Sequence, residues 1–233
     1  METCFDALPK DRIKAVADGF LKADIEIKSI ISEYAGNLQV TKCEKIIDSQ
    51  GIYTIEKSHY LQDDNKIRMD ERKDTEEYVI TFRHEYGHFI DEQLGRPSLK
   101  EEFGMAIQAD FFWYNRNTDY GEKNLKKMLT ELEKSETIDS RYFSDILSGI
   151  FHNDRVVREV YDENGVAFYG HTNYYWGGIE GPENAVEKEV FANLFAIYAE
   201  NNGEIVSFVE KSFPNIVKQF RRTLGDRNGK SRI

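Results

Sequence analysis

The residues best suited to chemistry lie in one short segment, Thr81 to Asp91, which reads T-F-R-H-E-Y-G-H-F-I-D. Because one helical turn separates His84 from His88, both imidazoles leave the same face of a helix and can bind one Zn²⁺. Glu85 then lies where it can activate the water on that metal. The alternative is a chance match on a helix whose histidines face solvent or core, and five histidines in 233 residues make it rare. The pattern predicts a zinc-dependent hydrolase.

The residues around this motif favour a helix that runs from about residue 75 to residue 95. Apolar side chains recur at helical spacing, at Tyr78, Val79, Phe82, Tyr86, Phe89 and Ile90. Thr75-Glu76-Glu77 provides an N-terminal cap with acids near the positive end of the helix dipole. Gly95 followed by Arg96-Pro97 ends the helix. The motif therefore sits in mid-helix, where a zinc site needs it.

A catalytic zinc site usually takes three protein ligands, so a third ligand must come from elsewhere in the chain. The segment from Asn184 to Ala199 predicts a second helix, strongly apolar after Glu189, that can pack beside the first. We favour Glu189 as the third ligand, because a carboxylate that completes a histidine pair is a recurrent catalytic set. His152 and His171 are alternatives, and Glu189 could instead be a favourable charge on the first turn of its helix.

These two segments resemble the zincin metallopeptidases of the gluzincin type, and most closely the family of the anthrax lethal factor catalytic domain. In that family a helix with the pattern H-E-x-G-H-x-x-D supplies two zinc ligands and the base, and a helix with E-x-F-A-x-x-F supplies a glutamate ligand. Matched by position, the resemblance implies that His84, His88 and Glu189 are the ligands and Glu85 the base. Asn193 stands where the family often carries another Glu behind the metal.

A second resemblance is to the metallopeptidase-like domains attached to phage minor head proteins. It rests on Phe143 to Ser148, Gly170 to Trp176, the Glu189 helix and Phe213-Pro214. Together the two resemblances cover roughly residues 65 to 224. They imply a zincin-like fold, a Zn²⁺ cofactor and a protein or peptide substrate.

Amide hydrolysis at such a site also needs proton transfer and a donor for the negative charge that develops on the carbonyl oxygen. Glu85 would take the proton of the water and later deliver it to the leaving amine. The loop from Gly170 to Gly178 offers His171, Tyr174 and Tyr175 as oxyanion donors, with His171 slightly ahead of Tyr175. Packing of an aromatic loop is the alternative for each of them.

Two acidic residues could orient a ligand imidazole through its second nitrogen, as groups behind metal ligands often do. Asp91 lies three residues beyond His88, and its alternative role is that of an ordinary helix-surface acid. Asp145 could act in the same way, or it could belong to the cap of a helix that begins near Ser144.

The chain is acidic, with 31 basic residues against 42 acidic residues and a net charge of −11. This balance argues against a nucleic-acid surface and favours a protein or peptide substrate of basic character. Cys4 and Cys43 are too few for a disulfide framework. Neither a signal peptide nor a membrane-spanning apolar run is visible. We therefore expect a protein of the cytoplasm, of a phage particle or delivered as an effector, and no oligomeric state is predicted.

Periodicity along the chain predicts one α+β domain over residues 1–233, mostly helical with a small twisted sheet, and the resemblance implies that its fold is zincin-like. Its expected parts are an N-terminal helix in 1–36, a small sheet in 38–70, a metal-site core in 75–201 and C-terminal helices in 203–225. The N-terminal helix is predicted to run unbroken from 9 to 35, with a stripe formed by Ile13, Val16, Ala17, Phe20, Ile27 and Ile31.

Shorter elements are predicted from local patterns. Strands are expected at 39–41, 51–55 and 66–69, and the segment from Lys66 to Asp70 is expected to be the edge strand against which a peptide would lie. Helices are expected near 99–115, 121–135 and 140–151, followed by a hairpin around Asp162 to Gly165. The aromatic cluster from Phe111 to Tyr114 is expected in the core.

Three functions are compatible with these patterns. The leading hypothesis is a zinc metalloendopeptidase that cleaves a protein substrate, as a toxin-like effector or a phage-associated protease. The first alternative is a catalytically silent zincin-fold protein with a structural or binding role in a phage or prophage particle. The second is a zinc hydrolase that acts on another bond, because the metal ligands alone do not dictate an amide.

Overall fold

A computed structural model describes residues 9–47, 53–115, 117–151, 171, 173–176 and 183–225. The helices are α1 (Lys10–Lys22), α2 (Ile25–Tyr34), α3 (Thr75–Gln93), α4 (Glu101–Trp113), α5 (Asp119–Lys134), α6 (Ser144–Ile150), α8 (Asn173–Trp176), α9 (Ala185–Glu200), α10 (Gly203–Ser212) and α11 (Pro214–Gly225). The strands are β1 (Gln39–Lys42), β2 (Lys45–Ile47), β3 (Tyr53–Ile55), β4 (His59–Leu61) and β5 (Lys66–Met69). Short 3₁₀ turns lie at Ala35–Asn37, Gln62–Asp64, Pro97–Leu99 and Ser140–Phe143. The predicted α+β class, mostly helical with a small sheet, is confirmed.

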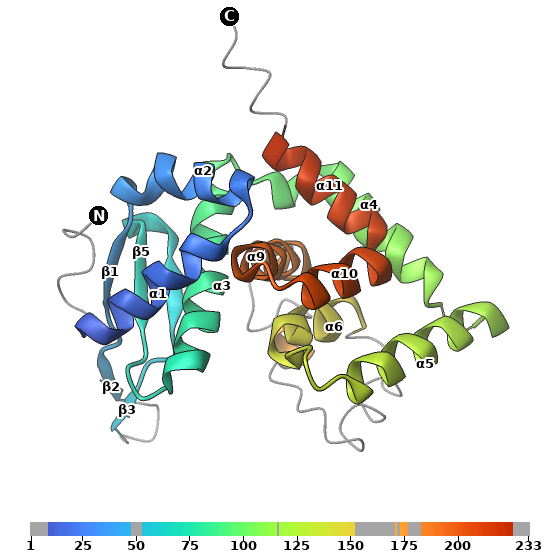
Figure 1. The fold of residues 1–233 in the computed structure, drawn as a ribbon, viewed down its shortest axis with the longest axis horizontal. Helices are drawn as coiled ribbons and strands as arrows, with labels where there is room; N and C mark the ends of the chain where they lie inside the picture. Colours follow the sequence, from blue (N-terminus) through green and yellow to red (C-terminus); the bar gives the residue numbers. More distant parts are fainter. Residues whose placement is uncertain are drawn as a thin grey trace, which may run out of the picture.

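Helix α9 lies at the centre of the molecule. The sheet and α1 to α3 lie on one side of it, and α4, α5, α6, α10 and α11 lie on the other (Figure 1). From Glu189 to Ala199 every residue of α9 is buried. A helix that is apolar on all sides is stable only when other elements cover all of its faces, which explains the central position of α9. Within the described residues, no helix is long and apolar enough to cross a bilayer.

Three strands form a mixed sheet in the order β1-β5-β4. Strand β5 pairs in parallel with β1 and antiparallel with β4. The expectation that residues 66–70 form the edge is therefore wrong, because β5 has a neighbour on each side and buries Ile67 and Met69 completely. The edge strands are β1 and β4, and the three residues of β4 are too few to show the alternation that reveals a strand in a sequence.

Strands β2 and β3 form a separate antiparallel pair. The strands predicted at 39–41 and 66–69 are confirmed by β1 and β5, and β3 lies within the range predicted at 51–55. The hairpin predicted around residues 162–165 lies outside the described residues.

The N-terminal helix is interrupted, in contrast to the prediction of one helix over residues 9–35. Ala23 has an extended conformation and ends α1, and the Asp24 side chain accepts a hydrogen bond from the Glu26 backbone N–H at the start of α2. Asp24 is a favourable N-cap, so it starts a new helix inside a stretch whose apolar period continues. Most of the predicted stripe packs inward, but Ala17 is exposed.

Helix α3 has well-defined ends. Its N-cap is Asp74, whose carboxylate accepts from the Glu77 backbone N–H, so the cap lies one residue before the predicted segment. At the other end Gly95 adopts φ +76°, and Arg96 N–H donates to the Asp91 carbonyl. This left-handed glycine terminus is a common helix stop, and it confirms the predicted end of the helix.

The aromatic cluster at the end of α4 is only partly in the core. Phe103, Ile107 and Asp110 are buried on one face of α4 and Tyr114 is buried just after its end, whereas Phe112 is 65% exposed and Trp113 is 51% exposed. The expectation of burial is wrong for these two residues, because they project about 100–200° around the helix from the buried face.

Helices α3 and α9 cross at Gly87, the glycine within the histidine motif. A Cβ atom at Gly87 would lie 2.7 Å from the Ala192 Cα atom and 2.8 Å from its carbonyl oxygen. Only glycine permits backbones to approach so closely. The crossing is flanked by Arg83 of α3, a buried residue that pairs with Glu200 of α9 and donates to the Tyr142 hydroxyl at 3.0 Å.

We predict that Gly87→Ala lowers the free energy of unfolding by about 1–3 kcal/mol, because the added methyl group forces two backbones apart. Gly104→Ala is the matched control, since Gly104 is also helical and its Cβ would meet only a flexible Glu187 oxygen at 3.7 Å. The control should be neutral or stabilising by up to about 1 kcal/mol. Denaturant unfolding monitored by circular dichroism measures both values. Equal stability of the two variants would show that the α3–α9 contact is not tight.

Candidate active site

His84 and His88 project from the same face of α3. Their Nε2 atoms lie 3.2 Å apart, and the two rings are nearly perpendicular. Both side chains are mostly buried, and both line a cavity of about 340 Å³. The two nitrogens therefore converge at the wall of a cleft.

Glu189 of α9 brings a carboxylate oxygen to the same point. Its Oε2 lies 2.9 Å from His84 Nε2 and 3.2 Å from His88 Nε2. In a tetrahedral zinc site with bonds of about 2.0–2.1 Å, ligand atoms lie about 3.3 Å from one another. The three separations in this cluster are close to that value. The donor atoms could therefore hold one zinc ion with only small movements of the side chains.

The Glu189 carboxylate has an unusual environment. It is 3% exposed, and Oε2 accepts no well-aligned hydrogen bond from the described residues. Burial by itself would raise the pKa of Glu189, but His88 and His84 hold that pKa well below its ordinary value. For His84, burial acts to lower the pKa, and contact with Glu189 outweighs it and raises the pKa to about 10. A buried anion facing two imidazoles is suited to binding a cation between them.

Glu85 is the next side chain in this cleft. Burial raises the pKa of its carboxylate, and the nearby His84 and His88 oppose that rise. A carboxylate with a raised pKa accepts a proton more readily than an ordinary exposed glutamate. Glu85 is thus a candidate general base beside the two histidines.

The cleft extends to both sides of these residues. The cavity of about 340 Å³ adjoins a second of about 860 Å³, and Ser58, His84, Glu85 and His171 line both. On one side the cleft reaches Tyr60 and Arg96, and on the other it reaches Arg72 and Arg141. This shape leaves room for an extended ligand that passes over Glu85.

Tyr175 and His171, both predicted as oxyanion donors, make different contacts with Glu189. The Tyr175 hydroxyl donates to Glu189 Oε1 at 2.5 Å, so it orients the carboxylate. The His171 ring stacks on Tyr175 at a centroid distance of 3.6 Å and is 41% exposed. His171 Nε2 lies 3.6 Å from Glu189 Oε1. Of these two side chains, His171 is the better placed to donate to a ligand, while Tyr175 already has an acceptor. The third candidate, Tyr174, has a side chain outside the described residues.

The acidic residues behind the cluster have other partners. Asp91 accepts from the backbone N–H and hydroxyl of Ser98, at 3.0 and 2.5 Å, so it fastens the turn after α3. Asp145 lines the larger cavity, and its Oδ1 has no hydrogen-bond partner among the described residues. Burial and the charge of Glu189 raise the pKa of Asp145. Asn193 stands where the resembled family often has a glutamate, and its side chain donates to the Glu189 backbone carbonyl at 3.0 Å. A glutamate at this position would add a carboxylate beside Asp145 and Glu189.

Strand β4 contributes residues that were not predicted from the sequence. His59 and Tyr60 of this edge strand line the smaller cavity together with His171. In the sequence, these residues stood out only because His59 is a histidine outside the predicted helices. Its position near the cleft became clear only when β4 was seen to be an edge strand. His152, an alternative third ligand, lies outside the described residues.

Comparison with known proteins does not assign the chain to a family. No protein-family model, curated protein or solved structure matches the chain. The chemistry of the cleft must therefore be argued from its side chains.

We predict that Tyr175→Phe weakens zinc binding by about 10–100-fold, because Glu189 loses the donor that orients its carboxylate. Competition with a zinc chelator measures the affinity. Tyr60→Phe is the matched control, since it removes a hydroxyl from the same cleft without touching Glu189. An unchanged affinity in Tyr175→Phe, or an equal loss in the control, would contradict this role.

Proposed function

We propose that this protein is a zinc-dependent metallopeptidase of the gluzincin type, with a zincin-like fold, that hydrolyses peptide bonds of a protein substrate. One observation carries the proposal: donor atoms of His84, His88 and Glu189 lie within 4.8 Å of one another. The carboxylate comes from a helix that is 101 residues away in the sequence. An accidental histidine motif would have no reason to meet a buried glutamate there.

Zinc bound to these three residues would supply a Lewis acid that lowers the pKa of a coordinated water to about 7. Glu85 accepts the proton of the attacking water, and it then donates that proton to the leaving amine. His171 donates a hydrogen bond to the oxygen of the scissile carbonyl as negative charge develops there. Tyr175 keeps the Glu189 carboxylate turned toward the histidines.

The edge strand supports a peptide as the substrate. Strand β4 pairs with β5 on one side only, and its residues line the cleft that contains His84 and Glu85. An extended peptide can pair with such an edge through backbone hydrogen bonds and then lies across the reactive residues. The same arrangement, an edge strand above the metal-binding helix, is expected of a zincin-like fold.

Substitution of Glu85 separates catalysis from metal binding. We predict that Glu85→Gln keeps bound zinc and lowers hydrolysis of an unfolded casein substrate by about 10²–10⁴-fold, the usual contribution of general-base catalysis. His84→Ala, His88→Ala and Glu189→Ala should lose both zinc and activity. Elemental analysis by mass spectrometry and the release of peptides measure the two properties.

Glu101→Gln is the control for this series, because Glu101 lies on the exposed first turn of α4 and lines neither cavity. It should keep zinc and activity. Zinc loss in Glu85→Gln as severe as in the ligand variants would contradict the assigned role. A zinc-loaded protein with no Glu85-dependent cleavage would instead support the silent binding protein.

Substitution of His171 tests the oxyanion donor. We predict that His171→Ala lowers kcat by about 10²–10³-fold and leaves KM and zinc content nearly unchanged, because the hydrogen bond is made mainly in the transition state. Steady-state kinetics and elemental analysis check both parts. Unchanged turnover would make the loop a packing element, and loss of zinc would make His171 a ligand.

A further inference from the structure

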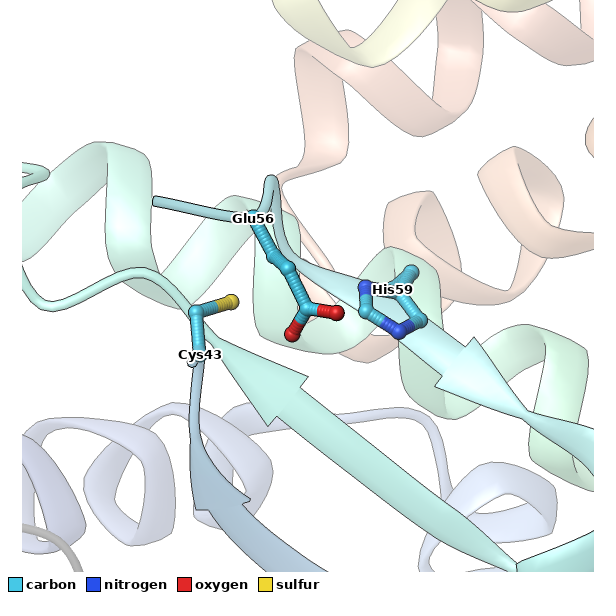
Figure 2. Close-up of side chains that lie close together, drawn as sticks. All are labelled: Cys43, Glu56 and His59. Atoms are coloured by element: carbon cyan, nitrogen blue, oxygen red, sulfur yellow. The ribbon is translucent and has the colours of Figure 1, made fainter. Parts of the chain in front are cut away.

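We propose that Cys43, Glu56 and His59 form a second metal site, which takes a zinc-like divalent cation at the end of the sheet beside the cleft. One donor atom from each residue lies within 4.8 Å of the other two. Figure 2 shows the Glu56 carboxylate lying between the Cys43 thiol and the His59 ring. The site shares no residue with the His84 cluster, and it stands without the proposed peptidase activity.

The three donors come from three different elements. Cys43 directly follows β1, Glu56 directly follows β3, and His59 is the first residue of β4. The Cys43 backbone N–H donates to the Met69 carbonyl at the end of β5, so the thiol is carried by an ordered part of the sheet. Three strand ends, rather than one flexible loop, therefore bring the donors together.

The mixture of sulfur, nitrogen and oxygen identifies the class of cation. Thiolate and imidazole are ligands of zinc and similar transition metals, whereas calcium and magnesium prefer oxygen atoms. Three protein ligands leave the fourth tetrahedral position to water or another small ligand. We infer a site for zinc, with cobalt(II) as a spectroscopic substitute.

Hydrogen bonds around the cluster orient two of the donors. His59 Nδ1 lies 2.7 Å from the Lys57 carbonyl oxygen, which accepts its proton and leaves the lone pair on Nε2. Arg68 Nη1 donates to both oxygens of Glu56, at 3.1 and 2.9 Å. Histidine ligands commonly donate their second ring nitrogen to a backbone carbonyl, and carboxylate ligands are commonly hydrogen-bonded from behind.

The competing interpretation is a surface ion pair between Arg68 and Glu56 with an unrelated cysteine nearby. Arg68 also pairs with Glu44, so its guanidinium is shared between two carboxylates. Glu56 Oε2 also accepts from the Glu44 backbone N–H at 3.2 Å, whereas Oε1 accepts only from Arg68 among the described residues and keeps a second lone pair that a cation can use. An ion pair explains the position of Glu56 but gives no reason for a thiol and an oriented imidazole on either side of its carboxylate.

The location of this site connects it to the cleft. His59 also lines the cavity that contains His84 and Glu85. A metal at this position would join the ends of β1 and β3 to the start of the edge strand β4. It would therefore fix β4 at its first residue, which lines the cleft.

Cobalt(II) titration of the metal-free full chain tests the proposal, because thiolate ligation produces a charge-transfer band in the near ultraviolet that the His84 site, which has no sulfur, cannot produce. We expect two equivalents of cobalt per chain and this band. Cys43→Ser should bind one equivalent and lose the band. His59→Ala should also bind one equivalent, and circular dichroism checks that both variants fold.

Two matched variants complete the experiment. Cys4→Ser should keep both equivalents and the band. His84→Ala should lose one equivalent and keep the band, so failure of the first site does not hide the second. The proposal is overturned if the wild-type chain shows no thiolate band, or if the band survives Cys43→Ser or disappears in Cys4→Ser.

Discussion

The backbone contact between Gly87 and Ala192 is the constraint on which the rest of the structure depends. Helices that pack through side chains lie about 8–10 Å apart, and a glycine at the crossing lets their backbones approach more closely. Glu189 lies three residues before Ala192, and His84 and His88 flank Gly87 in sequence, so this contact brings carboxylate and imidazoles to within 2.9–3.2 Å. Because zinc bonds are only about 2 Å long, a wider crossing would separate the three donors.

This crossing also explains why polar and charged side chains are buried at the centre of the molecule. Helix α9 is covered on all sides, so Glu189 is held away from water and must find its partners inside. Tyr175 takes one of its oxygens, and the two histidines face the other. The buried Arg83 pairs separately with the half-buried Glu200 at the far end of the same contact.

The two helices of the site could be predicted from the sequence, because histidines at positions i and i+4 and an apolar run after Glu189 are local patterns. Other features depend on contacts that are distant in the chain. Tyr175 donates to Glu189, and Asp91 accepts from Ser98. Strand β5 is central and β1 and β4 are the edges, which the sequence did not predict because the pattern of one strand does not give the pairing order. The start of a new helix at Asp24 was not predicted, because the apolar period of the N-terminal segment continues past this N-cap residue.

The most direct test of this account is anomalous diffraction at the zinc edge from crystals of the zinc-loaded protein. The account predicts an anomalous peak about 2.0–2.2 Å from Nε2 of His84, Nε2 of His88 and Oε2 of Glu189, with Glu85 beside the remaining coordination position. A peak that lacks the Glu189 carboxylate, or zinc bound to only one of the two histidines, would contradict the claim that the α3–α9 crossing creates the metal centre.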